Sequence, residues 1–204
     1  MSWTIDPPKD LDQEDGEVKR KLADAIQAAA NANILMFCAA SDKGAKFTDT
    51  FPSRASNCIF TIGAADATGA VDAWVGNPLN VNFTFPGTNV DVDDSALGKN
   101  VTGSSIATAY AAGLAALILY IVQIKLLRAT NPAEKAAIQT DFDKIRKHDG
   151  MMKAFRKVGT TPESQNKFIA VWDVFGAVVE EKDRYNKMQQ ELIDQIANLG
   201  SKFV

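Results

Sequence analysis

The chain has 204 residues, of which 46% are hydrophobic, and this is enough for one domain with a sizeable core. Charged residues make up 23% and the formal net charge is −3, so the balance argues against nucleic acid or an anionic membrane as a partner. The single histidine, His148, limits histidine chemistry within the chain to one position.

The N-terminal residues turn acidic and show no secretory signal pattern, so we expect a cytoplasmic protein. The most apolar segment, residues 110–127, contains Gln123 and Lys125 and is interpreted as a buried helix of a soluble protein. Cys38 and Cys58 lie in apolar runs. We interpret both as reduced core residues rather than as disulfide or metal-binding residues.

The first expected elements are a helix and two buried strands. Apolar residues recur at helical spacing over residues 16–31, and a short Asn-Ala-Asn run ends this helix. The continuous apolar runs 34–40 and 58–64 are typical of strands that are buried on both faces of a parallel sheet.

The middle of the chain predicts short strands, a loop and one long helix. Strands are predicted at 73–75 and 81–85, and the second ends at the turn dipeptide Pro86-Gly87. Residues 91–100 form a polar loop, in which the aspartates are interpreted as a solvated turn rather than a cation site. Residues 105–127 predict a long helix with small residues at its start.

The composition changes after the Asn-Pro pair at 131–132. Residues 132–148 predict a charged amphipathic helix with proline in its first turn, where the missing N–H is harmless. A short helix is predicted at 151–158, and a strand or turn at 168–175. The apolar stripe over 178–199 is close to a heptad and indicates a core or docking face.

Two serines, Ser104 and Ser105, open the long helix. Unpaired N–H groups and the helix dipole favour negative charge at such a position, which would stabilise an alkoxide or a nearby oxyanion. The more common use of serine there is simply to cap the helix. Residues 103–107 also match a loose nucleophile elbow of the α/β-hydrolases, but the preceding residues 97–101 make a poor strand.

Residues 103–119, GSSIATAYAAGLAALIL, resemble the nucleophile motif of the subtilisin-like serine proteases, Gly-Thr-Ser-Met-Ala-Thr-Pro-x-Val-Ala-Gly-x-Ala-Ala-Leu. The resemblance implies that Ser105 is the nucleophile. The chain departs from the motif at Ser104 for Thr, Ile106 for Met and Ala109 for Pro.

Residues 34–44, ILMFCAASDKG, resemble the family strand and turn Val-Val-Val-Ala-Ala-Ala-Gly-Asn-x-Gly. The residues of this run look most similar to those of intracellular fungal subtilases. The Asn of that block donates to the oxyanion, and here its position is Asp42. A carboxylate cannot donate unless it is protonated, and removing an oxyanion donor costs about 2.7–4 kcal/mol. Some subtilases carry Asp at this position. On the residues alone, Asp42 is a turn former.

Three further blocks carry the same resemblance. Residues 51–66 are similar to the family stretch Tyr-Pro-Ala…Val-Ile-x-Val-Gly-Ala, and residues 81–87 to the strand that ends in Pro-Gly. Residues 1–4 resemble the Met-Ser-x-Gly strand that lines the primary specificity pocket, with Thr4 in place of Gly. The resemblance implies substrate contacts at Ser2, Trp3, Ala39, Ala40 and Ser41.

The triad Asp and His of the family precede the Met-Ser-x-Gly strand, at which this sequence begins, so the resemblance predicts a partial peptidase domain. His148 follows the nucleophile helix in a charged stretch, and we interpret it as a solvated helix-end residue rather than as the base. Without a base, Ser105 is a weak nucleophile.

The sequence therefore predicts a subtilisin-like α/β fold, a mostly parallel sheet flanked by helices, over residues 1–130, with a helical extension over residues 131–204. The predicted function is a serine endopeptidase that acts through an acyl-enzyme on Ser105 and is inactive as this chain. The alternative is a non-catalytic interaction module. We expect a peptide or protein substrate, no metal or cofactor, and no nucleic-acid or membrane partner. Self-association or a partner chain is expected through the exposed sheet edge or the C-terminal helix.

Overall fold

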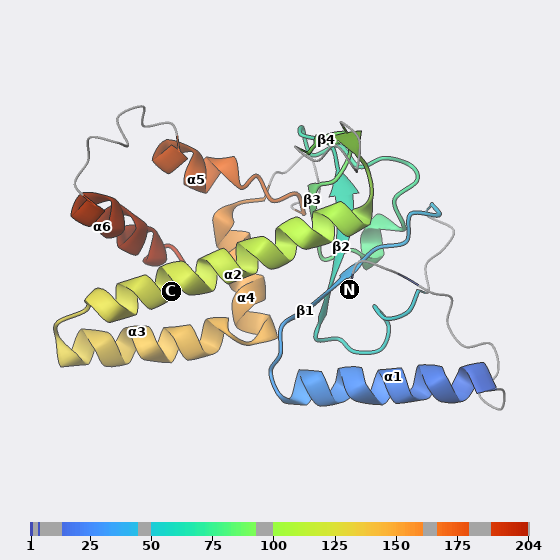
Figure 1. The fold of residues 1–204 in the computed structure, drawn as a ribbon, viewed down its shortest axis with the longest axis horizontal. Coiled ribbons are helices and arrows are strands. Elements are labelled where there is room, and N and C mark those ends of the chain that lie inside the picture. Colours follow the sequence, from blue (N-terminus) through green and yellow to red (C-terminus); the bar gives the residue numbers. More distant parts are fainter. Residues whose placement is uncertain are drawn as a thin grey trace. The chain divides into compact units, whose positions relative to one another are not determined.

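The computed structural model describes Met1, Thr4 and residues 14–44, 50–92, 100–160, 167–179 and 189–203 (Figure 1). The elements are α1 (Glu14–Asn31), β1 (Met36–Ala39), β2 (Ile59–Ala65), the 3-10 helix η1 (Pro78–Asn80), β3 (Phe83–Pro86), β4 (Val90–Asp91), β5 (Asn100–Val101), α2 (Ser104–Arg128), α3 (Pro132–Ile145), α4 (His148–Val158), α5 (Trp172–Val179) and α6 (Gln189–Gly200). The chain divides into two compact units, Met1–Ala112 with Thr161–Phe168, and Gly113–Thr160 with Ile169–Val204. The domain boundary at residue 130 stays a prediction.

The first unit contains a three-stranded parallel sheet in the order β1-β2-β3 (Figure 1). All residues of β1 and β2 are buried, because both faces of the sheet are covered, and this explains their unbroken apolar runs. Phe37 pairs with Phe60 in register, and their rings stack with centroids 4.9 Å apart. The α/β fold and the two buried strands predicted from the sequence are confirmed, although β1 is shorter than the predicted run 34–40 and Ile34 is exposed.

The short strand predicted at 73–75 is wrong, because these residues form a turn in which the Val75 N–H donates to Asp72 O (3.1 Å). Strand β3 begins two residues later than predicted. Before it, Asn82 pairs with Thr61 through both its side chain (Oδ1 accepts from Thr61 N–H, 2.7 Å) and its main chain (N–H donates to Thr61 O, 2.8 Å).

Helix α1 ends in the way that its Asn-Ala-Asn run indicates. Asn33 has a left-handed φ of 56°, a conformation that asparagine tolerates better than most residues. Its N–H donates to Ala30 O (2.9 Å) and the Ile34 N–H donates to Ala29 O (3.0 Å). This pair of bonds satisfies two carbonyls at the helix end and turns the chain into β1. The buried Ile26 of α1 belongs to the same core cluster as residues of β1 and β2.

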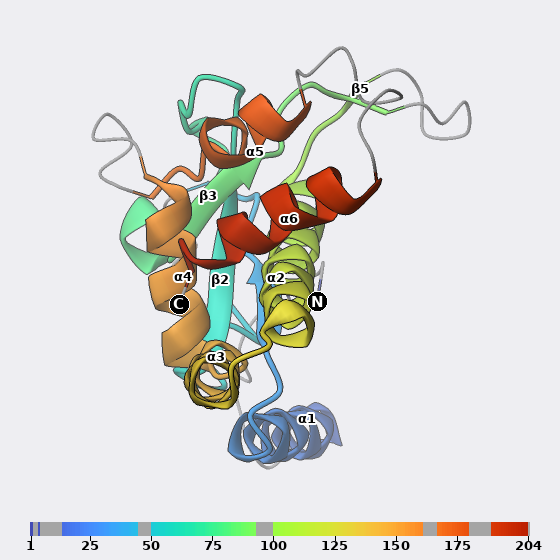
Figure 2. The same cartoon turned by 90° about the vertical axis from the view of Figure 1, so that its left-hand side faces the viewer.

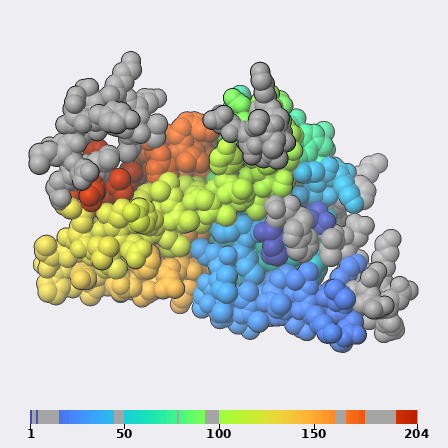
Figure 3. All heavy atoms as spheres, in the orientation of Figure 1, coloured from blue at the N-terminus to red at the C-terminus, as the bar shows by residue number. Residues whose placement is uncertain are grey.

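Helix α2 matches the long helix that the sequence predicts. By length and composition it is apolar enough to cross a membrane, a test that core helices of globular proteins also pass. One side of it is buried, including Ala107, Ala111 and Ile118, while Tyr110 and Tyr120 are exposed. Much of α2 reaches the surface in Figure 3.

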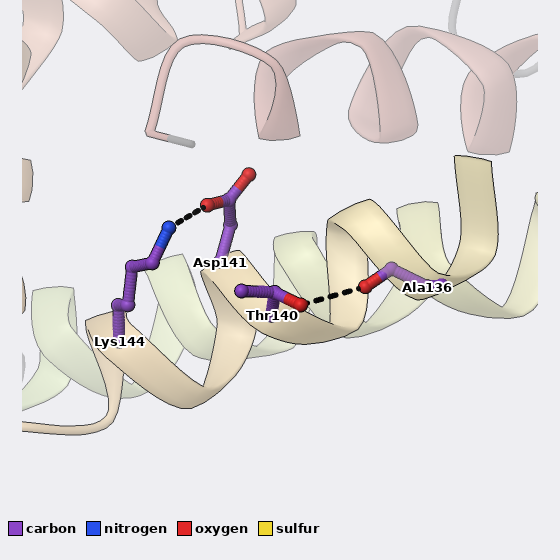
Figure 4. Close-up of polar contacts among 4 residues, drawn as sticks. All are labelled: Ala136, Thr140, Asp141 and Lys144. Carbon is purple, nitrogen blue, oxygen red and sulfur yellow. Dashed lines mark hydrogen bonds and ion pairs between the residues drawn. The ribbon is translucent and has the colours of Figure 1, made fainter. Parts of the chain in front are cut away.

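In the second unit, α3 runs back beside the C-terminal half of α2 (Figures 1 and 2). Its N-cap is Asn131, whose Oδ1 accepts from the N–H of Ala133 (2.8 Å), and Pro132 occupies the first turn as predicted. On its exposed side, Thr140 Oγ1 donates to Ala136 O (2.9 Å) and Lys144 pairs with Asp141 (2.8 Å; Figure 4).

Helix α6 contacts the C-terminal half of α2. Residues 180–188 of the predicted stripe lie outside the described residues, and its role as a core or docking face stays a prediction. Arg128 of α2 forms an ion pair with Asp194 of α6, and Lys125 Nζ donates to Ser201 Oγ (2.9 Å). The sequence predicts either a strand or a turn at residues 168–175. The structure has isolated β-bridges at Phe168 and Ile169, followed by α5.

We predict that Gly87→Ala destabilises the first unit by about 1–3 kcal/mol, the usual cost of overpacking. A Cβ at Gly87 would lie 2.8 Å from Ala64 Cβ and 2.9 Å from Gly103 O, and the second contact is main chain that cannot rotate away. Gly113→Ala is the control, because a Cβ there meets nothing within 4 Å and alanine favours a helix. Urea denaturation measures the free energy of unfolding of both variants. A Gly87→Ala protein as stable as the parent would contradict the close contacts described at Gly87.

We predict that the Cys38 thiol resists iodoacetamide at pH 8 in the native protein. Burial raises the pKa of Cys38 to about 11, despite a hydrogen bond to Thr61, so the reactive thiolate is scarce at that pH. Mass spectrometry of Cys58→Ser protein, with and without urea, isolates the Cys38 reaction. Equal alkylation rates in the two conditions would show that Cys38 is not buried.

Candidate active site

Ser105 lies in the first turn of α2 and is half-buried. Gly87 is the residue that follows β3. The turn begins where the Gly103 N–H donates to the carbonyl oxygen of Gly87 (2.7 Å). The N–H groups of Ile106 and Ala107 donate back to Gly103 O (3.0 and 3.4 Å). Among the described residues, no acceptor is found for the Ser105 N–H.

Ser104, which precedes Ser105, has a structural role. It is fully buried, and its Oγ accepts from the Ala64 N–H of β2 (3.2 Å). Its carbonyl accepts from Thr108 Oγ1 (2.7 Å). The Ser104 hydroxyl therefore ties the helix to the sheet, and no such tie is found for the Ser105 hydroxyl among the described residues. This tie could not be predicted from the sequence, because Ala64 lies far from Ser104 along the chain.

Asp42 comes just after the C-terminal end of β1 and reaches the start of α2. Its Oδ2 accepts from the Ser104 N–H (3.0 Å). A Cβ placed on Gly103 would lie 3.5 Å from Asp42 Oδ2 and 3.2 Å from Ser105 Oγ, so both oxygens border the same small space. The structure thus brings together the two residues to which the sequence assigned catalytic positions.

Close packing fixes the turn that carries Asp42. The buried Ser41 accepts from the Lys43 N–H through its Oγ (3.3 Å), and the Gly44 N–H donates to Trp74 O (2.8 Å). A Cβ at Gly76 would lie 3.0 Å from Ser41 O, so the main chain here needs glycine opposite it. The sequence indicated the turn-forming residues, but it did not indicate the close approach of Gly76 to the main chain of Ser41.

The predicted substrate-binding residues lie partly within the described chain. Ala39, Ala40 and Ser41 are buried at the end of β1, beside Asp42. The Ala39 N–H donates to Met1 O (3.1 Å), so the chain before Ser2 lies beside β1. Ser2 and Trp3 lie outside the described residues. Substrate contact by all of these residues stays a prediction.

His148 is the first residue of α4, in the second unit. Its side chain is 18% exposed, so the expectation that it is solvated is wrong, and its Nδ1 lies 3.0 Å from Asp149 Oδ1. The predicted helix 132–148 ends at Ile145 instead, so His148 begins the next helix rather than ending this one. Among the described residues, no group of three His, Cys, Asp or Glu side chains is arranged to hold a metal ion, and Asp93 and Asp94 lie outside them.

Comparisons with known proteins bear on the fold and on the family of the chain. Among solved structures, a prenylagaramide maturation protease, PagA, matches 100% of this chain and 60% of its own, with a TM-score of 0.54 and 15% identity. A lanthipeptide protease matches 58% of this chain and 45% of its own, with a TM-score of 0.45 and 18% identity. The chain thus spans about half the length of these structures. No curated protein matches it. The model of the subtilase family, peptidase S8, matches residues 1–159, and the chain belongs to that family.

Proposed function

We propose that the chain provides the nucleophile side of a serine endopeptidase site, which cleaves peptide bonds through an acyl-enzyme on Ser105. The observation that carries this proposal is the convergence of Ser105 Oγ and Asp42 Oδ2 at the start of α2, in a chain of the subtilase family. The two solved structures named above are proteases by name, which supports a peptide or protein substrate. We place the protein in the cytoplasm, and the free thiols Cys38 and Cys58 support this location.

In the proposed reaction, Ser105 Oγ attacks the scissile carbonyl carbon and gives its proton to a base. The carbonyl oxygen becomes an oxyanion, and the unused Ser105 N–H at the positive end of α2 stabilises it. The C–N bond then breaks, and the base returns the proton to the leaving amine. Water hydrolyses the resulting acyl-enzyme by the same steps.

Asp42 weakens the oxyanion site. In the ionised state its oxygens only accept hydrogen bonds, and one of them already accepts from the Ser104 N–H. A carboxylate also repels a developing negative charge nearby. We infer that Asp42 fixes the turn geometry at a cost to transition-state stabilisation.

The base is the group that the first unit does not supply. The only histidine of the 204 residues is His148, which belongs to the second unit. We propose that the chain by itself does not hydrolyse peptides at a useful rate. Loss of the base leaves a residual acceleration of roughly 10³–10⁴ over water, from binding and the oxyanion site.

A non-catalytic interaction module is the second candidate function. The observation in its favour is the Asp42–Ser104 hydrogen bond, which uses the oxyanion-side residue as a structural tether. Such a module would keep the fold of the first unit while losing the chemistry. The two candidates differ in whether Ser105 can be activated by any base.

We predict that a fluorophosphonate probe leaves Ser105 unlabelled in the chain alone, because the probe needs an activated serine. Added imidazole should start the labelling by acting as an external base, and Ser105→Ala should abolish it. Mass spectrometry locates the adduct.

Rapid labelling without imidazole would refute the inactivity of the chain, and its loss in His148→Ala would identify His148 as the base. No labelling even with imidazole would refute Ser105 as the nucleophile and favour the interaction module.

We predict that Asp42→Asn raises the imidazole-assisted labelling rate roughly 10²–10³-fold at neutral pH, the range for one oxyanion donor. The amide oxygen can still accept from the Ser104 N–H, while the amide nitrogen gains two donors. Asp24→Asn, an exposed charge change on α1, is the matched control and should have no effect. An unchanged rate in Asp42→Asn would show that Asp42 does not face the oxyanion.

A further inference from the structure

The end of α3 and the helix α4 carry a dense group of basic side chains in the second unit. Residues 144–157 hold six of the 22 Lys and Arg residues of the chain and one of its 25 acids, Asp149. Outside this segment, acids therefore exceed bases by eight. A local charge opposite in sign to that of the rest of the chain favours the encounter of this segment with an anionic partner.

The basic side chains are exposed, and half of them follow one face of α4. Lys153, Arg156 and Lys157 are spaced by three and four residues, so their side chains are neighbours on the helix surface. The other face of α4 is buried, and its buried residues are Met151, Ala154, Phe155 and Val158. The helix therefore packs through its apolar side and presents its charges to solvent.

Three of these cations are not neutralised by nearby acids. Among the described residues, no ion pair is found for Lys147, Lys153 or Arg156. The one acid of the segment, Asp149, lies beside His148 instead, with 3.0 Å between Oδ1 and Nδ1. We call Lys147, Lys153 and Arg156 the basic face of α4.

Helix stability does not explain why position 147 is a lysine. Lys147 is the N-cap of α4, and its side chain makes no capping hydrogen bond. Ser, Thr, Asn or Asp would satisfy an N–H there, and a cation is unfavourable at the positive end of the helix dipole. Arg156 lies in the last turn, where a cation is favourable. A residue that breaks a local rule without a structural gain is expected at a functional surface.

The length of the basic face fits a short stretch of extended polypeptide. A helix rises about 1.5 Å per residue, so Lys147 and Arg156 lie about 14 Å apart along the axis of α4. An extended chain advances roughly 3.3 Å per residue, and about four or five residues would cover this distance. Carboxylates within such a stretch can meet each of the three cations.

We propose that the basic face of α4 binds an acidic segment of a partner polypeptide, whose carboxylates pair with Lys147, Lys153 and Arg156. The inference goes beyond the proposed function and does not depend on Ser105. An anionic membrane is disfavoured, because the apolar side of α4 is buried and cannot insert. A nucleic acid would extend past the basic face, and the acidic remainder of the chain would repel it.

Fluorescence anisotropy of the full chain with a dye-labelled decapeptide of alternating Glu and Gly tests the proposal. We expect binding at about 20 mM salt that is lost at about 0.5 M, because salt screens exposed charges. A decapeptide of alternating Ser and Gly should not bind. The triple variant Lys147→Gln, Lys153→Gln and Arg156→Gln should weaken binding at low salt at least about tenfold, since exposed ion pairs contribute little singly and act together here.

The matched control removes two lysines and one arginine at scattered exposed positions, and it should bind within about twofold of the parent. Its substitutions are Arg20→Gln, Lys135→Gln and Lys202→Gln.

Lys147→Gln alone should weaken binding about threefold, while Lys135→Gln alone leaves it unchanged. Urea denaturation should show that Lys147→Gln is at least as stable as the parent. Weaker binding without lower stability is a combination that a purely structural role of Lys147 would not give. If the triple variant does not fold, this pair of single variants decides the test.

Absence of decapeptide binding at low salt would overturn the inference, and so would equal weakening in the two triple variants. Duplex DNA and phosphatidylserine vesicles test other polyanions. Tighter binding to either one, lost in the α4 variant but kept in the control, would assign the basic face to that partner and also overturn the inference. Fluorophosphonate labelling of Ser105 is measured separately, so the proposed function stands or falls independently of these results.

Discussion

The start of α2 is held against the ends of β2 and β3 by contacts that leave no space for a side chain. Gly87 supplies the carbonyl that receives the Gly103 N–H, and a Cβ on it would overlap Ala64 of β2. The Ser104 hydroxyl adds a second tie from the helix to β2. Because these contacts fix both the direction and the depth of the helix start, the position of Ser105 depends on residues that take no part in chemistry.

Asp42 ties the turn after β1 to the start of α2, because its Oδ2 accepts from the Ser104 N–H. Under the proposed function this side chain also faces the oxyanion, where a hydrogen-bond donor would stabilise the transition state. An asparagine would keep the acceptor for the Ser104 N–H and add two donors, so the hydrogen bond to the helix does not by itself require an acid at position 42.

Much of the sheet was predictable because strands that are buried on both faces carry continuous apolar runs, as in residues 58–64. Helices α1 and α3 followed from their spacing, from the Asn-Ala-Asn run that ends α1 and from Pro132 in the first turn of α3, whereas α5 was not predicted. The turn at 73–75 was misread because three residues carry too little periodicity to separate a strand from a bend. The motif predicted that Ser105 opens α2 near Asp42, and its role as the nucleophile stays a prediction. The structural role of the Ser104 hydroxyl was not predictable, since it depends on a hydrogen bond from the Ala64 N–H, which is distant in the sequence.

A serine at a helix start becomes an effective nucleophile only when water is excluded from the site, because electrostatic stabilisation weakens in a high dielectric. In this chain the α2 wall beside Ser105 consists of small residues, and Ala109 and Ala112 remain exposed. Covering these residues would lower the dielectric around Ser105. An oxyanion formed at Ser105 under the proposed function would therefore be stabilised more strongly with the helix wall covered than with it open to water.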